Sequence, residues 1–139
     1  MNNKGFTLLE FLLYIGIVGI VLLVAGAIGL NVFFGKAKLG AIEEVSQNAR
    51  FAMEKVARVV RDGQDSSIFT LSDGTLLQSG VAITTNEVTI TDFQISDISY
   101  PNTPGTKRIQ MTVKHNNPEN RQEYEFEKIF YTTANIREK

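Results

Sequence analysis

Cysteine is absent from this chain of 139 residues. Its absence excludes disulfide bonds, thiolate zinc sites and cysteine nucleophiles together. The chain also has only one histidine, His115, which by itself cannot build a typical transition-metal site or a Ser-His-Asp triad. We expect His115 to lie in a loop or at the end of a strand. The sequence therefore predicts a protein that is not an enzyme, with no catalytic residue, cofactor or metal site.

An excess of one charge sign is lacking too, since the formal net charge is −1. Neither a basic patch for nucleic acid nor a long run of like charges is present. The scattered aspartates do not fit an EF-hand, and no glycine-rich phosphate loop is found outside the apolar run described next. The length leaves room for one membrane segment and one soluble domain of about 75 residues.

The most prominent feature is an uncharged apolar run over residues 11–34. It exceeds the roughly 20 residues that cross a bilayer as a helix, so it predicts a membrane segment. Glu10 stands directly in front of this run. Because an acid at the centre of a membrane helix costs roughly 2.5–3.5 kcal/mol, an acid so close to hydrocarbon indicates a function.

The six residues 5–10 read Gly-Phe-Thr-Leu-Leu-Glu and follow a lysine. This segment resembles the processing site of type IV prepilins and type II secretion pseudopilins. The resemblance implies that a membrane peptidase cuts after Gly5 and that the new N-terminal residue, Phe6, is N-methylated. It also implies that Glu10 guides the subunit into a filament.

The chemistry of these residues agrees with that implication. A cut between Gly5 and Phe6 creates a cationic amine about one helical turn from Glu10. A buried charge is tolerated when an opposite charge meets it, so the amine of an arriving subunit could pair with Glu10 of a subunit already in the fibre. Gly5 has no side chain and permits close approach of the peptidase to the backbone.

Four parts of the chain are expected: a leader peptide at 1–5, a transmembrane and assembly helix at 6–34, an amphipathic continuation of that helix at 35–63, and a globular β-rich head at 64–139. Apolar residues recur at helical spacing through the third part. They are Ile42, Val45, Ala49, Ala52 or Met53, Val56 and Val60. Gly63 is the expected C-terminal stop of the helix.

Beyond residue 66 the apolar period changes to two, which predicts an antiparallel sheet. Expected strands are 68–71 and 75–78 around an Asp73-Gly74 turn, then 81–84, 88–98, 108–115 and 123–132. Alternation breaks between Ile90 and Phe93, so we expect a β-bulge near residues 91–92. Residues 100–105 are expected to form a loop. The fold class is therefore α+β, with a long N-terminal helix packed on a C-terminal antiparallel sheet.

This expected architecture resembles that of the pilins, and the resemblance implies a subtype, partners and a location. Residues 47–50 (Gln-Asn-Ala-Arg) and 61–63 (Arg-Asp-Gly) look most like a minor pseudopilin of the J type. The implied partners are other pilin subunits, prepilin peptidase, a platform protein and an assembly ATPase. The implied location is the cytoplasmic membrane, in a single pass with an extracytoplasmic head, and then a pilus or pseudopilus.

Other interpretations remain open. Residues 25–27 (Ala-Gly-Ala) look like the cleavage site of a secretory signal peptide, although the apolar run continues beyond them. The chain could also be a single-pass anchored binding domain that forms no filament. Some pseudopilins bind calcium, so oxygen ligands within 116–120 are another possibility. The glycines at 16, 19, 26 and 29 are either ordinary in a membrane helix or contact points in a fibre.

Overall fold

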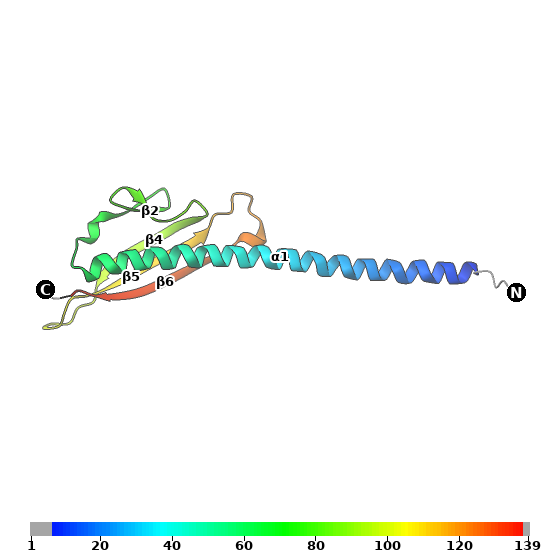
Figure 1. Cartoon of the computed structure of the whole chain (residues 1–139), viewed down its shortest axis with the longest axis horizontal. Helices are drawn as coiled ribbons and strands as arrows, with labels where there is room; N and C mark the ends of the chain where they lie inside the picture. Colours follow the sequence, from blue (N-terminus) through cyan, green and yellow to red (C-terminus); the bar gives the residue numbers. More distant parts are fainter. Residues whose placement is uncertain (1–6, 138–139) are drawn as a thin grey trace. The chain divides into compact units, whose positions relative to one another are not determined.

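The computed structural model of the protein describes residues 7–137. The chain divides into two compact units, residues 1–36 and residues 37–139. The N-terminal unit contains the first part of the helix α1, Leu8–Arg61. The C-terminal unit contains the rest of α1 and all the strands of the described chain (Figure 1).

The elements after α1 are short helices and strands of the C-terminal unit. In chain order they are the 3₁₀ helix η1 (Ser66–Ile68), strands β1 (Phe69–Ser72), β2 (Thr75–Gln78), β3 (Val81–Ala82), β4 (Val88–Asp97) and β5 (Thr106–His115), the 3₁₀ helix η2 (Gln122–Tyr124) and strand β6 (Glu127–Asn135). The predicted α+β class is confirmed. One N-terminal helix followed by antiparallel strands is a pilin-like architecture.

The C-terminal part of α1 is amphipathic and covers the sheet formed by β4, β5 and β6 (Figure 1). Its buried face recurs every three or four residues, as the sequence predicted. The buried residues of α1 are Ala41, Val45, Ala49, Ala52, Met53, Val56, Ala57, Val59 and Val60. Ile42, which was expected on this face, is only half-buried.

Gly63 ends α1 as predicted. Its φ of +68° is in the left-handed region that favours glycine. The amide of Gly63 donates to the carbonyl of Val60, and the amide of Gln64 donates to the carbonyl of Val59. These two bonds form a Schellman motif, which satisfies carbonyls that the last helical turn would leave unpaired.

The first sheet has the order β1-β2-β3 and is antiparallel. Ser72 pairs with Thr75, so Asp73 and Gly74 form a two-residue turn in which both φ angles are positive. Such a turn matches the twist of a hairpin, and the predicted hairpin is confirmed. A backbone bond of 2.7 Å from the amide of Ile90 to the carbonyl of Gly74 links this hairpin to β4.

The second sheet has the order β4-β5-β6 and is also antiparallel. Its register shifts between Ile90 and Asp92, which confirms the predicted bulge. The inward side of β5 supplies Ile109, Met111 and Val113, all fully buried against α1. The two sheets together with α1 enclose one apolar core, which contains no charged side chain.

Three expectations about the strands were wrong. The strands form two three-stranded sheets instead of one. The strand expected at 81–84 is only Val81–Ala82, since the hydroxyl of Thr84 instead accepts a bond from the amide of Leu76 at 3.1 Å. The last strand begins at Glu127, because residues 122–124 form η2, in which the ring of Tyr124 stacks on His115.

Candidate functional site at the N-terminal end of α1

Thr7 and Glu10 form a reciprocal hydrogen-bonded pair where α1 begins. The backbone amide and the hydroxyl of Thr7 each donate to Oε2 of Glu10 at 2.9 Å. In return, the backbone amide of Glu10 donates to Oγ1 of Thr7 at 3.2 Å. This is a capping box, in which two side chains satisfy amides that lack partners within the helix. The Thr-x-x-Glu spacing at residues 7–10 is the sequence signal for a capping box, which was not among the predicted features.

The capping box leaves Glu10 with capacity for another partner. An ionised carboxylate offers about four lone-pair positions, and Thr7 occupies two of them. Glu10 is exposed in the chain, so a group from outside can reach it. A carboxylate in the first turn also lies at the positive end of the helix dipole, which favours the charge. The site can therefore hold a fixed negative charge in front of an apolar helix.

The other two predicted site residues, Gly5 and Phe6, lie outside the described residues. The structure therefore places only Glu10 of the predicted site. Cleavage after Gly5 and methylation of Phe6 stay predictions.

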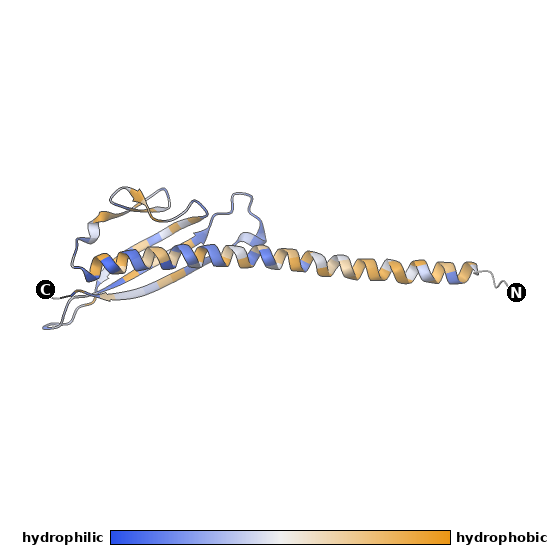
Figure 2. Cartoon of the chain, in the orientation of Figure 1, coloured by the Kyte–Doolittle hydropathy of each residue, from blue (hydrophilic) through white to orange (hydrophobic). Residues whose placement is uncertain are grey.

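The N-terminal unit exposes a continuous apolar surface. From Leu8 to Phe34 its large apolar side chains are all more than a third exposed. The most apolar window of 18 residues in α1 has a mean hydropathy of 2.8, and none of it is buried. Figure 2 shows this segment as almost uniformly hydrophobic, whereas the C-terminal part of α1 alternates. Length and composition make α1 the one helix of the described chain suited to span a membrane.

The glycines of this segment lie inside α1, and helix continues through them. A Cβ added at Gly16, Gly19, Gly26 or Gly29 would meet no atom within 4 Å. Close packing inside the subunit therefore does not explain these glycines. Residues 25–27, the alternative signal-peptide site, are helical as well.

A second group of polar residues gathers at one end of the C-terminal unit. Nε2 of His115 lies 3.0 Å from Oε2 of Glu44, although 71 positions separate the two residues. Tyr124 stacks on the His115 ring, and the guanidinium of Arg121 lies 4.9 Å from the centre of the Tyr124 ring. His115 is the last residue of β5, which confirms the expected strand end. Its contact with α1 was not predicted.

Arg121 and Glu123 stabilise the chain around this group. Nε of Arg121 donates to Oε1 of Glu123 at 2.9 Å. Bonds to its own backbone amide and to Arg121 hold the pKa of Glu123 below its ordinary value. The same bond to Glu123 raises the pKa of Arg121. This ion pair fixes the start of η2, on which the position of Tyr124 depends.

Comparison with protein families gives a match over the N-terminal segment. Residues 1–26 match the family described as the prokaryotic N-terminal methylation motif. The match includes Gly5, Phe6 and Glu10 and extends into the exposed apolar part of α1. Searches of curated proteins and of solved structures found no match. The chain thus carries, on a pilin-like α+β fold, the prepilin-type N-terminal signature of type IV pilins and pseudopilins.

Proposed function

We propose that this protein is a minor pilin or pseudopilin, a structural subunit of a type IV pilus or of a type II secretion filament. The observation that carries the proposal is the position of the methylation motif. It leads directly into the N-terminal part of α1, whose large apolar side chains from Leu8 to Phe34 are exposed. Such a surface must be covered by lipid or by other helices. A subunit that moves from the membrane into a filament exchanges its contacts with lipid for contacts with other helices.

Processing provides the charge for assembly. Prepilin peptidase cuts between Gly5 and Phe6, and the new amine of Phe6 is methylated. The cut removes residues 1–5, including the only lysine before the apolar run. The mature chain then begins with a cation, a short capping box and the carboxylate of Glu10.

Glu10 then serves as the acceptor for the amine of a neighbouring subunit. Inside a layer of apolar helices each charge would be costly alone, and the pair offsets that cost. Because the amine and the carboxylate of one chain are about one helical turn apart, pairing between chains fixes an axial step. Thr7 supports this role by holding the carboxylate against the first turn.

A role as a filament subunit also implies a membrane location and partners for the rest of the chain. The segment at 6–34 anchors the subunit in the cytoplasmic membrane in a single pass, and the C-terminal unit lies on the extracytoplasmic side. A platform protein and an ATPase of the machine drive assembly. The J-type likeness of residues 47–50 and 61–63 supports a minor subunit. Both stretches also have local roles, since Asn48 binds the turn before β4 and Gly63 caps α1.

The second candidate is an anchored monomer whose C-terminal unit binds a ligand outside the membrane. A polar hollow of about 430 Å³ at the end of β5 favours this candidate. The exposed apolar helix is required by both candidates, but only a filament subunit requires Glu10.

Variants of Glu10 separate the two candidates. The chain is expressed with its native assembly machinery, and incorporation into sheared, sedimented fibres is compared with the amount in the membrane. We expect Glu10→Ala to insert and to be processed, and to lose most of its incorporation. Glu10→Asp, which retains the charge, should incorporate better than Glu10→Ala. Normal incorporation of Glu10→Ala would refute the pairing of Glu10 with an amine.

A further inference from the structure

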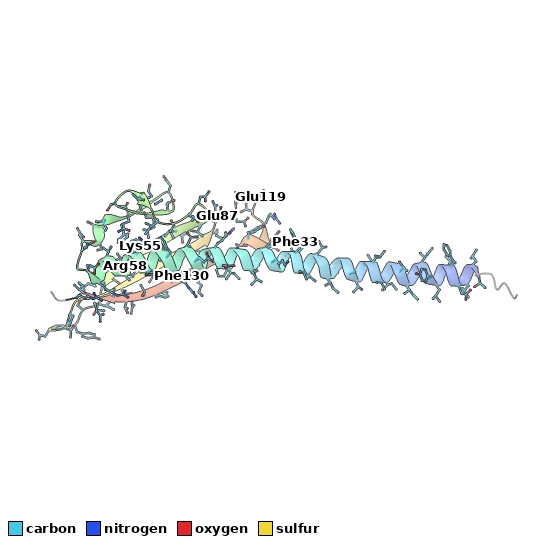
Figure 3. The ribbon with its side chains drawn as sticks, viewed as in Figure 1. Phe33, Lys55, Arg58, Glu87, Glu119 and Phe130 are labelled. Atoms are coloured by element: carbon cyan, nitrogen blue, oxygen red, sulfur yellow. The ribbon has the colours of Figure 1, made fainter. Side chains whose placement is uncertain are left out.

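Three potential metal ligands meet at one end of the C-terminal unit, each from a different element. Glu44 lies on α1, Glu87 lies in the turn before β4, and His115 ends β5. One ligand atom from each residue lies within 4.8 Å of the other two. Figure 3 labels Glu87 at the edge of the C-terminal unit, near the loop that carries Glu119. We propose that Glu44, Glu87 and His115 bind one divalent transition-metal ion, of which Zn²⁺ is the representative.

The backbone around Glu87 and His115 is fixed by the sheet. Val88 pairs with His115 in the register of β4 and β5. Beyond that pair, the amide of Asn116 donates to the carbonyl of Glu87 at 2.8 Å. The side chain of Asn116 adds a bond to the carbonyl of Asn86 at 3.1 Å. Glu87 and His115 therefore stand on two chain segments that cannot move independently.

Asn48 connects the same turn to α1. Its side-chain oxygen accepts the amide of Thr85 at 3.0 Å, and its side-chain nitrogen donates to the carbonyl of Glu44 at 3.0 Å. The residue thus joins the turn that carries Glu87 to the helical turn that carries Glu44. Rigid supporting contacts of this kind are what a preorganised ligand set needs.

The spacing of two of the three ligand atoms suits a shared ion. Nε2 of His115 and Oε2 of Glu44 are 3.0 Å apart. Two atoms that each lie about 2.1 Å from one zinc ion, at an angle of about 90° to 110°, are roughly 3.0–3.4 Å apart. The same 3.0 Å also suits a hydrogen bond, so an ion and a proton are alternative occupants of the space between the two atoms.

The charges around the three residues favour a cation. Within residues 7–137 no lysine or arginine forms an ion pair with Glu44 or Glu87, so two carboxylates meet without a permanent positive charge. The His115 side chain is only 8% exposed, and its Nδ1 is buried without a hydrogen-bond partner in that range. The ring nitrogen beside Glu44 is Nε2, so Nε2 is the atom that His115 offers as a ligand, and its burial shields the position next to it from water.

Access and chemistry define the type of ion. Glu87 is exposed and the Glu44 side chain is 46% exposed, so an ion can reach the site from solvent. One imidazole and two carboxylates suit zinc and its neighbours in the first transition series, whereas calcium prefers oxygen ligands alone. Three protein ligands leave a fourth position for water. The ion would link α1, the turn before β4 and β5 in a protein that has no cysteine for a disulfide.

The test uses the full-length chain without a polyhistidine tag, in detergent micelles, titrated with ZnCl₂ by calorimetry. We expect saturable binding of one ion per chain. Glu87→Gln changes an exposed residue and should leave the fold intact while weakening binding by at least about tenfold. Glu43→Gln is the matched control on α1, because Glu43 binds only Gln47 in the described chain, and it should bind like the wild type.

Nitrogen NMR identifies the ligand directly, since His115 is the only histidine of the chain. Zn²⁺ should shift the resonance of one ring nitrogen, and an excess of CaCl₂ should not. The proposal is overturned by the absence of saturable binding, by Glu87→Gln binding as tightly as the wild type, or by ring resonances that Zn²⁺ leaves unchanged. None of these results bears on filament assembly, so the proposal stands independently of the proposed function.

Discussion

The side chains of Thr7 and Glu10 each accept the backbone amide of the other residue at the first turn of α1. The Thr7 hydroxyl adds a third bond, at 2.9 Å, to the Glu10 carboxylate. The pair therefore begins the helix and also orients the one acid in front of the apolar segment. Glu10 has both a local role within the subunit and a proposed role between subunits, and variants of Thr7 separate them.

Thr7→Val keeps the shape of the side chain and removes its hydroxyl. We expect the first turn of α1 to be destabilised by about 1 kcal/mol, the usual loss for a missing helix cap. Hydrogen exchange of the Glu10 amide in detergent micelles should become faster. Thr7→Ser retains the hydroxyl and should exchange like the wild type. Equal exchange in the wild type and Thr7→Val would contradict the capping box.

The core of the C-terminal unit predicts a contrast between two isoleucines. Ile109 on β5 is fully buried, whereas Ile129 on β6 is 45% exposed on the outer side of the sheet. Ile109→Ala should lower the free energy of unfolding by about 2–5 kcal/mol, because it removes buried apolar surface and leaves a cavity. Ile129→Ala makes the same chemical change and should cost less than about 1 kcal/mol. Urea unfolding of both variants measures the difference, and similar midpoints would contradict the assignment of the faces.

Two glycines in similar turns allow the cost of a steric contact with Thr89 to be separated from the cost of backbone strain. Gly74 and Gly80 have φ angles of +74° and +82°. A Cβ on Gly74 would lie 2.5 Å from Cγ2 of Thr89, while a Cβ on Gly80 would meet no atom within 4 Å. Gly80→Ala therefore suffers only the backbone strain, about 1 kcal/mol, and Gly74→Ala should cost clearly more. Thermal unfolding measures both variants, and equal losses would show that Thr89 does not restrict the β1–β2 turn.

Acid should loosen the connection between β4 and β5. Asp97 accepts bonds from the hydroxyl and the amide of Ser99, and these bonds hold its pKa below the ordinary value. An aspartate whose pKa is lower in the folded than in the unfolded protein stabilises the fold when it is ionised. This contribution is complete above about pH 4, the unfolded pKa, and is lost as the pH falls through the pKa of the folded protein. Ser99→Ala removes one donor, so the pKa of Asp97 should rise toward its ordinary value. Carbon NMR titration of Asp97 tests this, and an unchanged pKa would refute the role of the Ser99 hydroxyl.

Local features of the fold could be predicted from the sequence because they depend on neighbouring residues. The Asp73-Gly74 turn, the stop at Gly63 and the bulge after Ile90 each follow from backbone preferences or from the apolar period. The start of β6 could not, because residues 123–126 alternate like a strand. Their actual conformation depends on the stacking of Tyr124 on His115, which belongs to another part of the chain.

Of the two candidate sites, one depends on neighbouring residues and could be predicted from the sequence, and the other depends on distant residues and could not. The contiguous motif at residues 5–10 was enough to predict a role for Gly5, Phe6 and Glu10. The contact between Glu44 and His115 joins residues 71 positions apart, and no local pattern indicates it. From the sequence we predicted no metal site, because His115 is the only histidine and the chain has no cysteine. The two carboxylates beside His115 come from distant parts of the chain, and only the fold brings them together.

The most direct test of the account is the N-terminal mass of the mature protein, isolated from its native membrane fraction. We predict a chain that begins at Phe6 and is heavier by one methyl group, with Gly5→Ala processed and Gly5→Leu left uncut. An intact N-terminus would contradict prepilin processing and favour the anchored monomer. A chain that begins at Ile28 would show signal-peptide cleavage and exclude the filament.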